Sequence, residues 1–233
     1  MGSESKGVGR LPKVLVGIPS RGVIPHAFVE TMNAALVGNG ELFFADFGHA
    51  KWQIPDDARN SFAQTAVDKN FDYLFMMDTD MTFPRGTLAM MIRHMANIKD
   101  EKPPILAGIY CNRGGDFRWH VYKWIEEEDG WHSLRFPLNQ GVMKVDAIGT
   151  GCMLIDVGVF EVIEWPWFEY EYLIFKGERD RMSEDMVFCK KAMKAGIPIY
   201  ADTDIKCGHF QSVVIEPTDE GGYQVKSLAG EVI

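Results

Sequence analysis

The sequence predicts a single α/β domain with a mostly parallel sheet flanked by helices, and three observations lead to that prediction. Short apolar runs alternate with helical patterns through the first 110 residues. The chain of 233 residues is long enough for one well-buried domain and only marginally long enough for two. It contains no internal repeat and no linker. Alternation of strands and helices is typical of βαβ units, whose strands pair in parallel.

The first half of the chain carries seven expected elements. Apolar runs that stop at proline, glycine or acidic residues predict four strands, at 13–19, 40–47, 71–78 and 103–110. Helices are expected at 24–38, at 54–69 and from Pro84 onward. The helix at 54–69 starts with a proline and two acids, as a helix N-terminus should. In the third helix the apolar positions fall at i, i+3, i+4 and i+7, on one face: Leu88, Met91, Ile92 and Met95.

The second half of the chain breaks this alternation. Residues 112–140, with three tryptophans among polar residues, are expected to form a hairpin or meander beside the sheet. Residues 142–156 predict a strand, a glycine-rich break and a second strand. A helix is expected over 183–196, with Ser183 as its N-cap and Gly196 at its end.

Two short strands, at 197–201 and 205–210, are expected to complete the fold. The polar segment that follows has no assignable pattern. The expected organisation is therefore a flexible tail, one domain and a C-terminal extension, over residues 1–12, 13–211 and 212–233.

The composition restricts the function. A formal net charge of −9 argues against general affinity for nucleic acid, which depends on clustered lysine and arginine. No apolar run approaches the roughly 20 residues of a membrane span, and the N-terminus lacks the apolar core of a secretory signal. Four dispersed cysteines without a Cys-x-x-Cys pair indicate buried free thiols rather than a zinc site or disulfides. A cytoplasmic location is therefore expected.

The tripeptide Asp-Thr-Asp occurs twice, each time after a short apolar run. The first copy, Asp78 to Asp80, ends a strand expected at the centre of the sheet, and ligands of open α/β sheets gather at the carboxyl ends of the strands. Its two carboxylates point to one side of an extended chain, so they could share a divalent cation. They could equally end a strand and cap the next helix. The second copy, 202–204, is expected in a turn.

The surroundings of the first copy resemble those of a known family. The stretches DDARNSFAQTAV (56–67), FDYLFMMDTDMTFPRGTLAMMI (71–92) and SEDMVFCKKAMKAGIPIYADTDIKCGHF (183–210) are similar to family-2-like glycosyltransferases that use nucleotide-sugar donors. The resemblance covers roughly residues 13–210. It implies a GT-A, Rossmann-like fold, with a mostly parallel central sheet and a small antiparallel addition. It also implies dependence on Mn²⁺ or Mg²⁺.

The resemblance assigns roles to residues of this sequence. Asp78 and Asp80 would hold the metal against the donor diphosphate, and His209 would be a further ligand whose imidazole suits Mn²⁺. Asp78 could instead bridge through water or hold the ribose. Asp185 would be the catalytic base that takes a proton from the acceptor hydroxyl, and Glu184 would bind sugar or acceptor hydroxyls. Ser-Glu-Asp is also an ordinary helix N-terminus, and His209 could be purely structural.

Further positions are expected to bind the substrate. They come from the ends of the first two strands, the second helix, the first Asp-Thr-Asp copy and the loop GTGC: Pro19, Ser20, Arg21, Asp46, Arg59, Asn60, Thr79, Gly149, Thr150 and Gly151. The glycines would let the backbone approach the ligand closely, or they form only a tight bend. Neither a P-loop nor a dinucleotide fingerprint occurs in the chain.

Two segments before the last helix leave alternatives open. The aromatic residues of 165–170 could stack on an acceptor sugar or belong to the core: Trp165, Trp167, Phe168 and Tyr170. The charged segment 175–182 would be a loop that closes over the donor and excludes water.

The predicted function is transfer of a sugar from a UDP-, GDP- or similar donor to a hydroxyl of a glycan, a small molecule or a protein. Inversion is favoured because Asp185 is placed as a base. The alternatives are a retaining transferase of the same fold, a sugar nucleotidyltransferase, and a binding module without turnover. The nucleotidyltransferase is disfavoured because GIPSRGVIP (17–25), after the first strand, contains no lysine.

Overall fold

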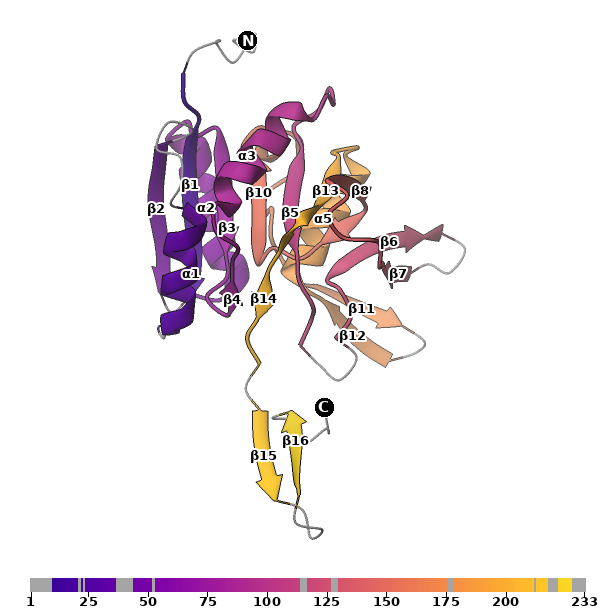
Figure 1. Cartoon of the computed structure of the whole chain (residues 1–233). Helices are drawn as coiled ribbons and strands as arrows, with labels where there is room; N and C mark the ends of the chain where they lie inside the picture. Colours follow the sequence, from indigo (N-terminus) through magenta and orange to yellow (C-terminus); the bar gives the residue numbers. More distant parts are fainter. Residues whose placement is uncertain are drawn as a thin grey trace.

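The fold is built on a seven-stranded sheet with the strand order β2-β1-β3-β10-β5-β13-β8 (Figure 1). The structure is a computed structural model that describes residues 10–20, 22, 24–36, 44–51, 53–113, 117–126, 130–175, 178–211, 213–217 and 222–227. The strands of the sheet are β1 (Lys13–Ser20), β2 (Phe44–Lys51), β3 (Tyr73–Met77), β5 (Ile105–Ile109), β8 (Val142–Val145), β10 (Cys152–Asp156) and β13 (Ile199–Lys206).

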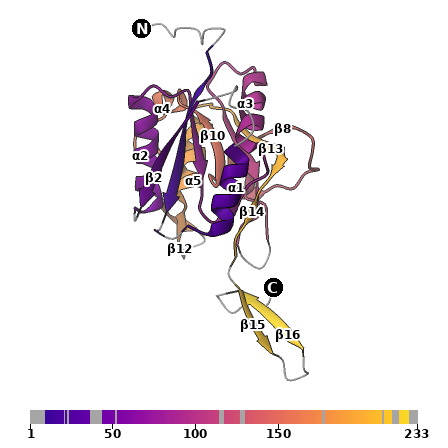
Figure 2. The ribbon, with the colours of Figure 1, turned by 60° about the vertical axis from the view of Figure 1, so that its left-hand side comes forward.

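Helices cover both faces of this sheet (Figure 2). They are α1 (His26–Leu36), α2 (Pro55–Asp68), α3 (Thr87–Asn97), α4 (Val159–Val162) and α5 (Glu184–Lys194). Side chains alternate along β3: Phe75 and Met77 belong to the core beneath α1 and α3, whereas Leu74 and Met76 belong to the core beneath α2, α4 and α5. The predicted α/β architecture is therefore confirmed.

The central sheet is mixed, whereas the sequence predicted a mostly parallel one. β1 is parallel to β2 and β3, and β13 is parallel to β5. β10 lies between β3 and β5 and is antiparallel to both, and β8 is antiparallel to β13. A strand that is buried on both faces is apolar throughout, so its sequence does not reveal its direction or its neighbours.

Of the four small sheets in the described part of the chain, two are formed by residues 121–182. β6 (Val121–Ile125) pairs with β7 (Gly130–Ser133) and with β9 (Ala147–Ile148), which confirms the predicted hairpin. β11 (Glu171–Phe175) pairs with β12 (Glu178–Met182). The charged segment 175–182, expected to be a loop that closes over the donor, therefore contributes β12 to a second hairpin. The backbone of β12 pairs with that of β11.

The second Asp-Thr-Asp copy lies within a strand, so the predicted turn is wrong. β13 continues through residues 202–204, and its pairing with β5 shifts register between Asp202 and Lys206. This shift is a β-bulge, which lets the strand continue past the polar tripeptide. Beyond it, β14 (Gly208–His209) pairs with β4 (Met81–Thr82), directly after the first copy.

The extension after residue 211 contains a further hairpin, formed by β15 (Val213–Pro217) and β16 (Tyr223–Ser227). It projects away from the helices and the central sheet in both views (Figures 1 and 2). All four cysteines are free; Cys152 and Cys189 are buried as predicted, whereas Cys111 and Cys207 are only half-buried. In the described part of the chain, no helix combines the length and apolar character that crossing a membrane requires.

Candidate functional site

Two adjoining cavities open where β1, β3 and β5 end. The first has a volume of about 410 Å³ and is lined by Pro19, Ser20, Pro25, Gln53, Pro55, Arg59, Asp78, Thr79, Asp80, Arg113 and Glu184. The second has a volume of about 310 Å³ and is lined by Arg59, Asp78, Asp80, Met81, Tyr110, Asn112, Arg113, His120, Thr150, Ser183, Glu184, Asp185 and His209. The two cavities share three carboxylates and two arginines, so they form one bipartite site.

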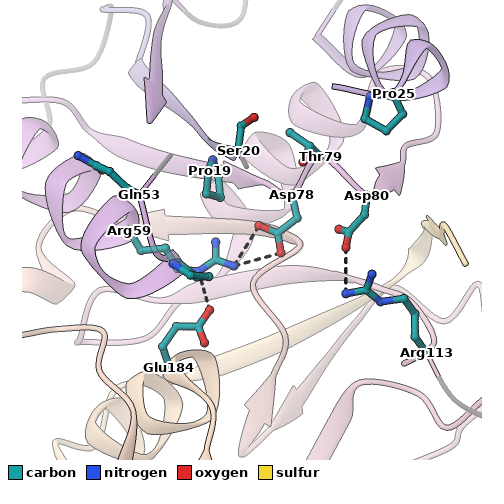
Figure 3. A pocket seen from close by; sticks show the side chains of 11 residues that line it. Pro19, Ser20, Pro25, Gln53, Arg59, Asp78, Thr79, Asp80, Arg113 and Glu184 are labelled. Carbon is teal, nitrogen blue, oxygen red and sulfur yellow. Dashed lines mark hydrogen bonds and ion pairs between the residues drawn. The ribbon is translucent and has the colours of Figure 1, made fainter. Parts of the chain in front are cut away.

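Arg59 joins the first Asp-Thr-Asp copy to the start of α5 (Figure 3). Its Nη2 lies 3.1 Å from Asp78 Oδ2, and its Nε lies 3.3 Å from Glu184 Oε1. Burial alone would lower the pKa of Arg59, but the charges of Asp78, Glu184 and Asp185 raise it above its ordinary value. Burial raises the pKa of Asp78 and of Glu184, and the charge of Arg59 opposes both shifts. The guanidinium is therefore a fixed positive charge between two buried acids.

The position of Arg59 follows from how α2 sits on the sheet. Phe62, less than one turn further along α2, packs against Gly17 of β1 and Gly48 of β2. A Cβ at Gly17 would lie 2.8 Å from the Phe62 ring, and a Cβ at Gly48 would lie 2.9 Å from it. The two glycines therefore let the helix approach the strands closely, which places Arg59 at the end of β1.

Asp80 faces away from Arg59, toward Arg113 and His209. Its Oδ2 lies 3.1 Å from Arg113 Nη2 and 3.5 Å from His209 Nε2. His209 is brought there by the β4–β14 pairing and by a hydrogen bond from Phe210 N to Asp80 O of 2.7 Å. Burial raises the pKa of Asp80, but the hydrogen bond and charge of His209 and the charge of Arg113 outweigh it and lower the pKa overall.

Asp185 lies in the first turn of α5, at the second cavity. Its Oδ1 accepts hydrogen bonds from Ser183 Oγ and from Met186 N, the latter at 2.8 Å. Ser183 occupies the N-cap position as predicted, but its hydroxyl orients Asp185 and does not cap a backbone N–H group. The second carboxylate oxygen, Oδ2, lies 3.7 Å from His120 Nδ1.

Tyr110 and His120 form the wall of the second cavity behind Asp185. Their rings stack with centroids 5.4 Å apart, and Tyr110 Oη lies 3.3 Å from His120 Nδ1. Gly149 makes this possible, because a Cβ there would lie 1.9 Å from Tyr110 Oη and 2.0 Å from His120 Nδ1. Burial and the charge of Asp185 raise the pKa of Tyr110 well above its ordinary value, so the phenol remains protonated.

Most of the residues predicted from the sequence meet at these cavities. The first cavity includes Pro19, Ser20 and Thr79, and the second includes Thr150, Asp185 and His209. Arg59, Asp78, Asp80 and Glu184 line both.

Other predicted residues lie elsewhere. Asn60 exchanges two hydrogen bonds with the backbone of Phe168, at 2.7 and 3.1 Å. The backbone of Asp46 lies in the middle part of β2, in register with Leu15, and not at the end of the strand. Gly149 and Gly151 are packed beneath Tyr110. Arg21 lies outside the described residues.

The aromatic segment before α5 divides between core and surface. Trp167 and Phe168 are buried, and the Phe168 ring stacks on Phe188 with centroids 4.4 Å apart. Trp165 is 68% exposed. Tyr170 stands next to Glu184, and burial together with the hydrogen bond and charge of Glu184 raises its pKa to about 12. Of the four aromatic residues, Tyr170 is therefore the one in contact with a residue of the site.

Sequence reasoning missed Tyr110, Arg113 and His120. Tyr110 and Arg113 follow β5 directly, so they share the sheet edge of the first Asp-Thr-Asp copy, and that position was a usable signal. His120 had no comparable local signal. It reaches the site because its backbone N–H donates to Tyr110 O at 2.9 Å and its carbonyl accepts from Gly149 N at 3.0 Å.

The charges and donor atoms of the site fit a divalent cation held by Asp80 and His209. The lining residues of the two cavities include four carboxylates and two guanidinium groups, which leaves an excess of two negative charges. His209 Nδ1 donates to Cys111 O at 2.8 Å, so Nε2 faces Asp80; it donates to that carboxylate when protonated and offers a lone pair to a cation when neutral. Asp78 Oδ1 is buried and has no hydrogen bond among the described residues, but it lies 3.0 Å from Arg59 Nη2, so its charge is already paired.

A second group of possible metal ligands surrounds the other Asp-Thr-Asp copy. Ligand atoms of His94, Asp202 and Asp204 lie within 4.8 Å of one another, a condition that, among the described residues, Asp78, Asp80 and His209 do not meet. Asp202 is fully buried, and its Oδ2 lies 2.6 Å from His94 Nδ1. Asp204 Oδ1 accepts a hydrogen bond from Gly141 N at 3.2 Å. These contacts equally describe a hydrogen bond between His94 and the buried Asp202 that links α3 to β13.

Comparison with known proteins places the fold. No protein family matches the sequence, and no curated protein matches it. The crystal structure of A197 from STIV aligns over 91% of this chain and 93% of its own, with a TM-score of 0.58 and 17% identity. The structure of GalNAc-T7 with UDP, GalNAc and Mn²⁺ aligns over 87% of this chain, with a TM-score of 0.55 and 14% identity. This chain spans only 44% of GalNAc-T7. The α/β fold, with its mixed seven-stranded sheet and small antiparallel sheets, is therefore GT-A-like.

Proposed function

We propose that this protein is a metal-dependent glycosyltransferase that moves a sugar from a nucleoside-diphosphate sugar to a hydroxyl acceptor, with inversion. One observation carries the proposal. Asp78 and Asp80 after β3, His209 in β14 and Glu184 with Asp185 in α5 are far apart in the sequence but surround two adjoining cavities. GalNAc-T7, which shares the fold, was crystallised with UDP, GalNAc and Mn²⁺, the kinds of ligand that this site would require.

The first cavity is the donor side in this proposal. Pro19 and Ser20 at the end of β1 and Thr79 would contact the nucleotide, and Arg59 and Arg113 supply positive charge near the diphosphate. Asp80 and His209 would hold the cation, preferably Mn²⁺ because one ligand is an imidazole. When bound, the cation neutralises charge that develops on the leaving diphosphate.

The second cavity is the acceptor side. Ser183 Oγ and Met186 N fix Oδ1 of Asp185, which leaves Oδ2 to take the proton of an acceptor hydroxyl. That hydroxyl oxygen then attacks the anomeric carbon on the face opposite the diphosphate, which inverts the configuration. Glu184 is held by Arg59 between the two cavities, where its carboxylate can accept hydrogen bonds from sugar hydroxyls.

The test is a thermal-shift panel of UDP- and GDP-sugars with and without Mn²⁺, followed by assays of donor hydrolysis and of transfer to simple glycans. We expect one donor to raise the melting temperature only when Mn²⁺ is present. At a donor concentration of one hundred times Kd the stabilisation is about 2.7 kcal/mol. Failure of every donor to give a Mn²⁺-dependent shift would refute the proposal.

Two matched substitutions test which Asp-Thr-Asp copy binds the metal. Asp80→Asn keeps the shape of the side chain but removes its charge, and we expect it to abolish the Mn²⁺-dependent shift. Asp204→Asn makes the same change in the group beside His94 and is expected to leave the shift in place. The opposite pattern would locate the functional cation at the second copy and overturn the proposed site.

A further inference from the structure

His120 faces the carboxylate oxygen of Asp185 that the helix terminus leaves unused. Oδ1 of Asp185 is engaged by Ser183 Oγ and Met186 N, whereas Oδ2 lies 3.7 Å from His120 Nδ1. Both residues line the second cavity. An imidazole next to a carboxylate is suited to accepting a proton from it.

The contact between Tyr110 and His120 admits a tautomer in which Nδ1 of His120 carries the lone pair. Tyr110 Oη accepts a hydrogen bond from Gly151 N at 3.3 Å, and its own hydrogen can be donated to His120 Nδ1, also at 3.3 Å. A neutral His120 whose Nδ1 accepts must carry its hydrogen on Nε2. The lone pair of Nδ1 then lies between the tyrosine hydroxyl and Asp185 Oδ2.

Neighbouring residues fix both the ring and the backbone of His120. Its ring stacks on Tyr110 at an interplanar angle of 25° and meets the edge of Tyr122 at 79°. Its backbone is bonded to Tyr110 on one side and to Gly149 on the other. The side chain keeps 21% of its surface exposed, so the ring also has a path to water.

We propose that His120 is a positioning and relay residue that receives, through Asp185, the proton released by the acceptor hydroxyl. The inference rests on the proposed function. The acceptor O–H bond breaks, the oxygen bonds to the anomeric carbon, and the proton goes to Asp185 Oδ2. The Oδ2–H proton then passes to His120 Nδ1 while the hydroxyl of Tyr110 turns away. The imidazolium gives up one proton to water, and exchange with water restores the Nε2–H form.

The groups that face this imidazole come from three elements. Tyr110, at the end of β5, and Tyr122, in β6, contact the ring, and Asp185 approaches it from α5. Tyr110 stays protonated and Tyr122 meets the ring edgewise. Asp185 is therefore the carboxylate placed to exchange a proton with His120.

The experiment compares transfer by the full chain and by its His120→Gln variant between pH 6 and 9. We expect kcat to fall about a hundredfold, the lower limit for loss of a proton-transfer group, with KM for the donor unchanged. Added imidazole should restore part of the kcat of the variant, because a small base can replace the missing ring. His132→Gln, in β7 and outside both cavities, is the matched control and should retain the wild-type pH profile.

Two outcomes separate this inference from the proposed function. A wild-type protein that transfers sugar, together with a His120→Gln variant of equal kcat and pH profile, overturns the relay and leaves the function intact. A wild-type protein without any transfer overturns both. The tautomer is tested independently of activity by ¹⁵N NMR of the imidazole groups. The expected form is Nε2–H in the wild type, shifting toward Nδ1–H in Tyr110→Phe, whereas Nδ1–H in the wild type contradicts the relay.

Discussion

At Gly149 one added carbon atom would meet two side chains of the site at once. The Cβ of Gly149→Ala would overlap Tyr110 Oη and His120 Nδ1, at 1.9 and 2.0 Å. Both rings must move, at a cost of about 1–3 kcal/mol in the free energy of unfolding. We expect the variant to lose transfer, because Asp185 lies beside the displaced rings, and to weaken the Mn²⁺-dependent donor shift much less, because Tyr110 meets His209 only edgewise, with centroids 5.5 Å apart.

The control for this substitution is Gly151→Ala in the same loop. Its Cβ would lie 3.2 Å from Tyr110 Cζ and 3.3 Å from the Met81 side chain, contacts that small adjustments can relieve. The melting temperature and transfer rate should therefore change much less. Equal losses in both variants would show that the loop, and not the two rings, determines the effect.

Because of Cys189, we expect the free energy of unfolding to fall at alkaline pH. Burial raises the pKa of this thiol from 9.0 to about 12. The folded state therefore favours the neutral thiol, and this stabilisation is complete below pH 9 and lost as the pH rises toward 12. Urea unfolding at pH 7.5, 9 and 10.5 should show a falling free energy of unfolding, with a shallower fall in Cys189→Ala. Identical pH slopes for the two proteins would contradict this role of Cys189.

At the scale of elements, the contact of Phe62 with two glycines determines where α2 places Arg59. In Gly17→Ala the new Cβ would lie 2.8 Å from the Phe62 ring. The helix must then move outward, so we expect a loss of about 1–3 kcal/mol in stability and weaker donor binding. Phe62→Leu removes the ring, so the double variant should be more stable than the two single effects predict. If the effects of the two substitutions simply add in urea unfolding, the position of α2 does not depend on the contact between Gly17 and Phe62.

The elements themselves could largely be read from the sequence, because each follows from a local pattern. The apolar runs at β1, β3 and β5 and the proline-led start of α2 are signals within single segments. The direction of β10 and the strand character of residues 202–204 depend on pairing partners, which local patterns do not encode. The position of Asp78 and Asp80 at the cavities was predictable since they follow a strand, whereas Asp185 was singled out by the family resemblance. His120 was not, because only the folded backbone brings it beside Asp185.

At the scale of the whole molecule, β14 links the C-terminal part of the chain to the site. His209 reaches Asp80 through the β4–β14 pairing, while β15 and β16 pair with each other. A chain that ends after Gln211 should keep the Mn²⁺-dependent donor shift, and one that ends after Lys206 should lose it. Loss of the shift in both truncated proteins, with melting temperatures near that of the full chain, would mean that the extension itself contributes to binding.

The antiparallel strand at the centre of the sheet also determines the order in which the protein can form. β10 pairs with β3 across about eighty residues of chain and with β5 across almost fifty, so β5 stays separate from the parallel strands β1, β2 and β3 until residues 152–156 are available. During synthesis the edges of β3 and β5 are unpaired strands of the kind that attract other chains. The same pairing makes the folding of this domain depend on long-range contacts, which predicts slow folding. A fragment that stops before residue 150 should therefore aggregate and should not form an independent half-domain.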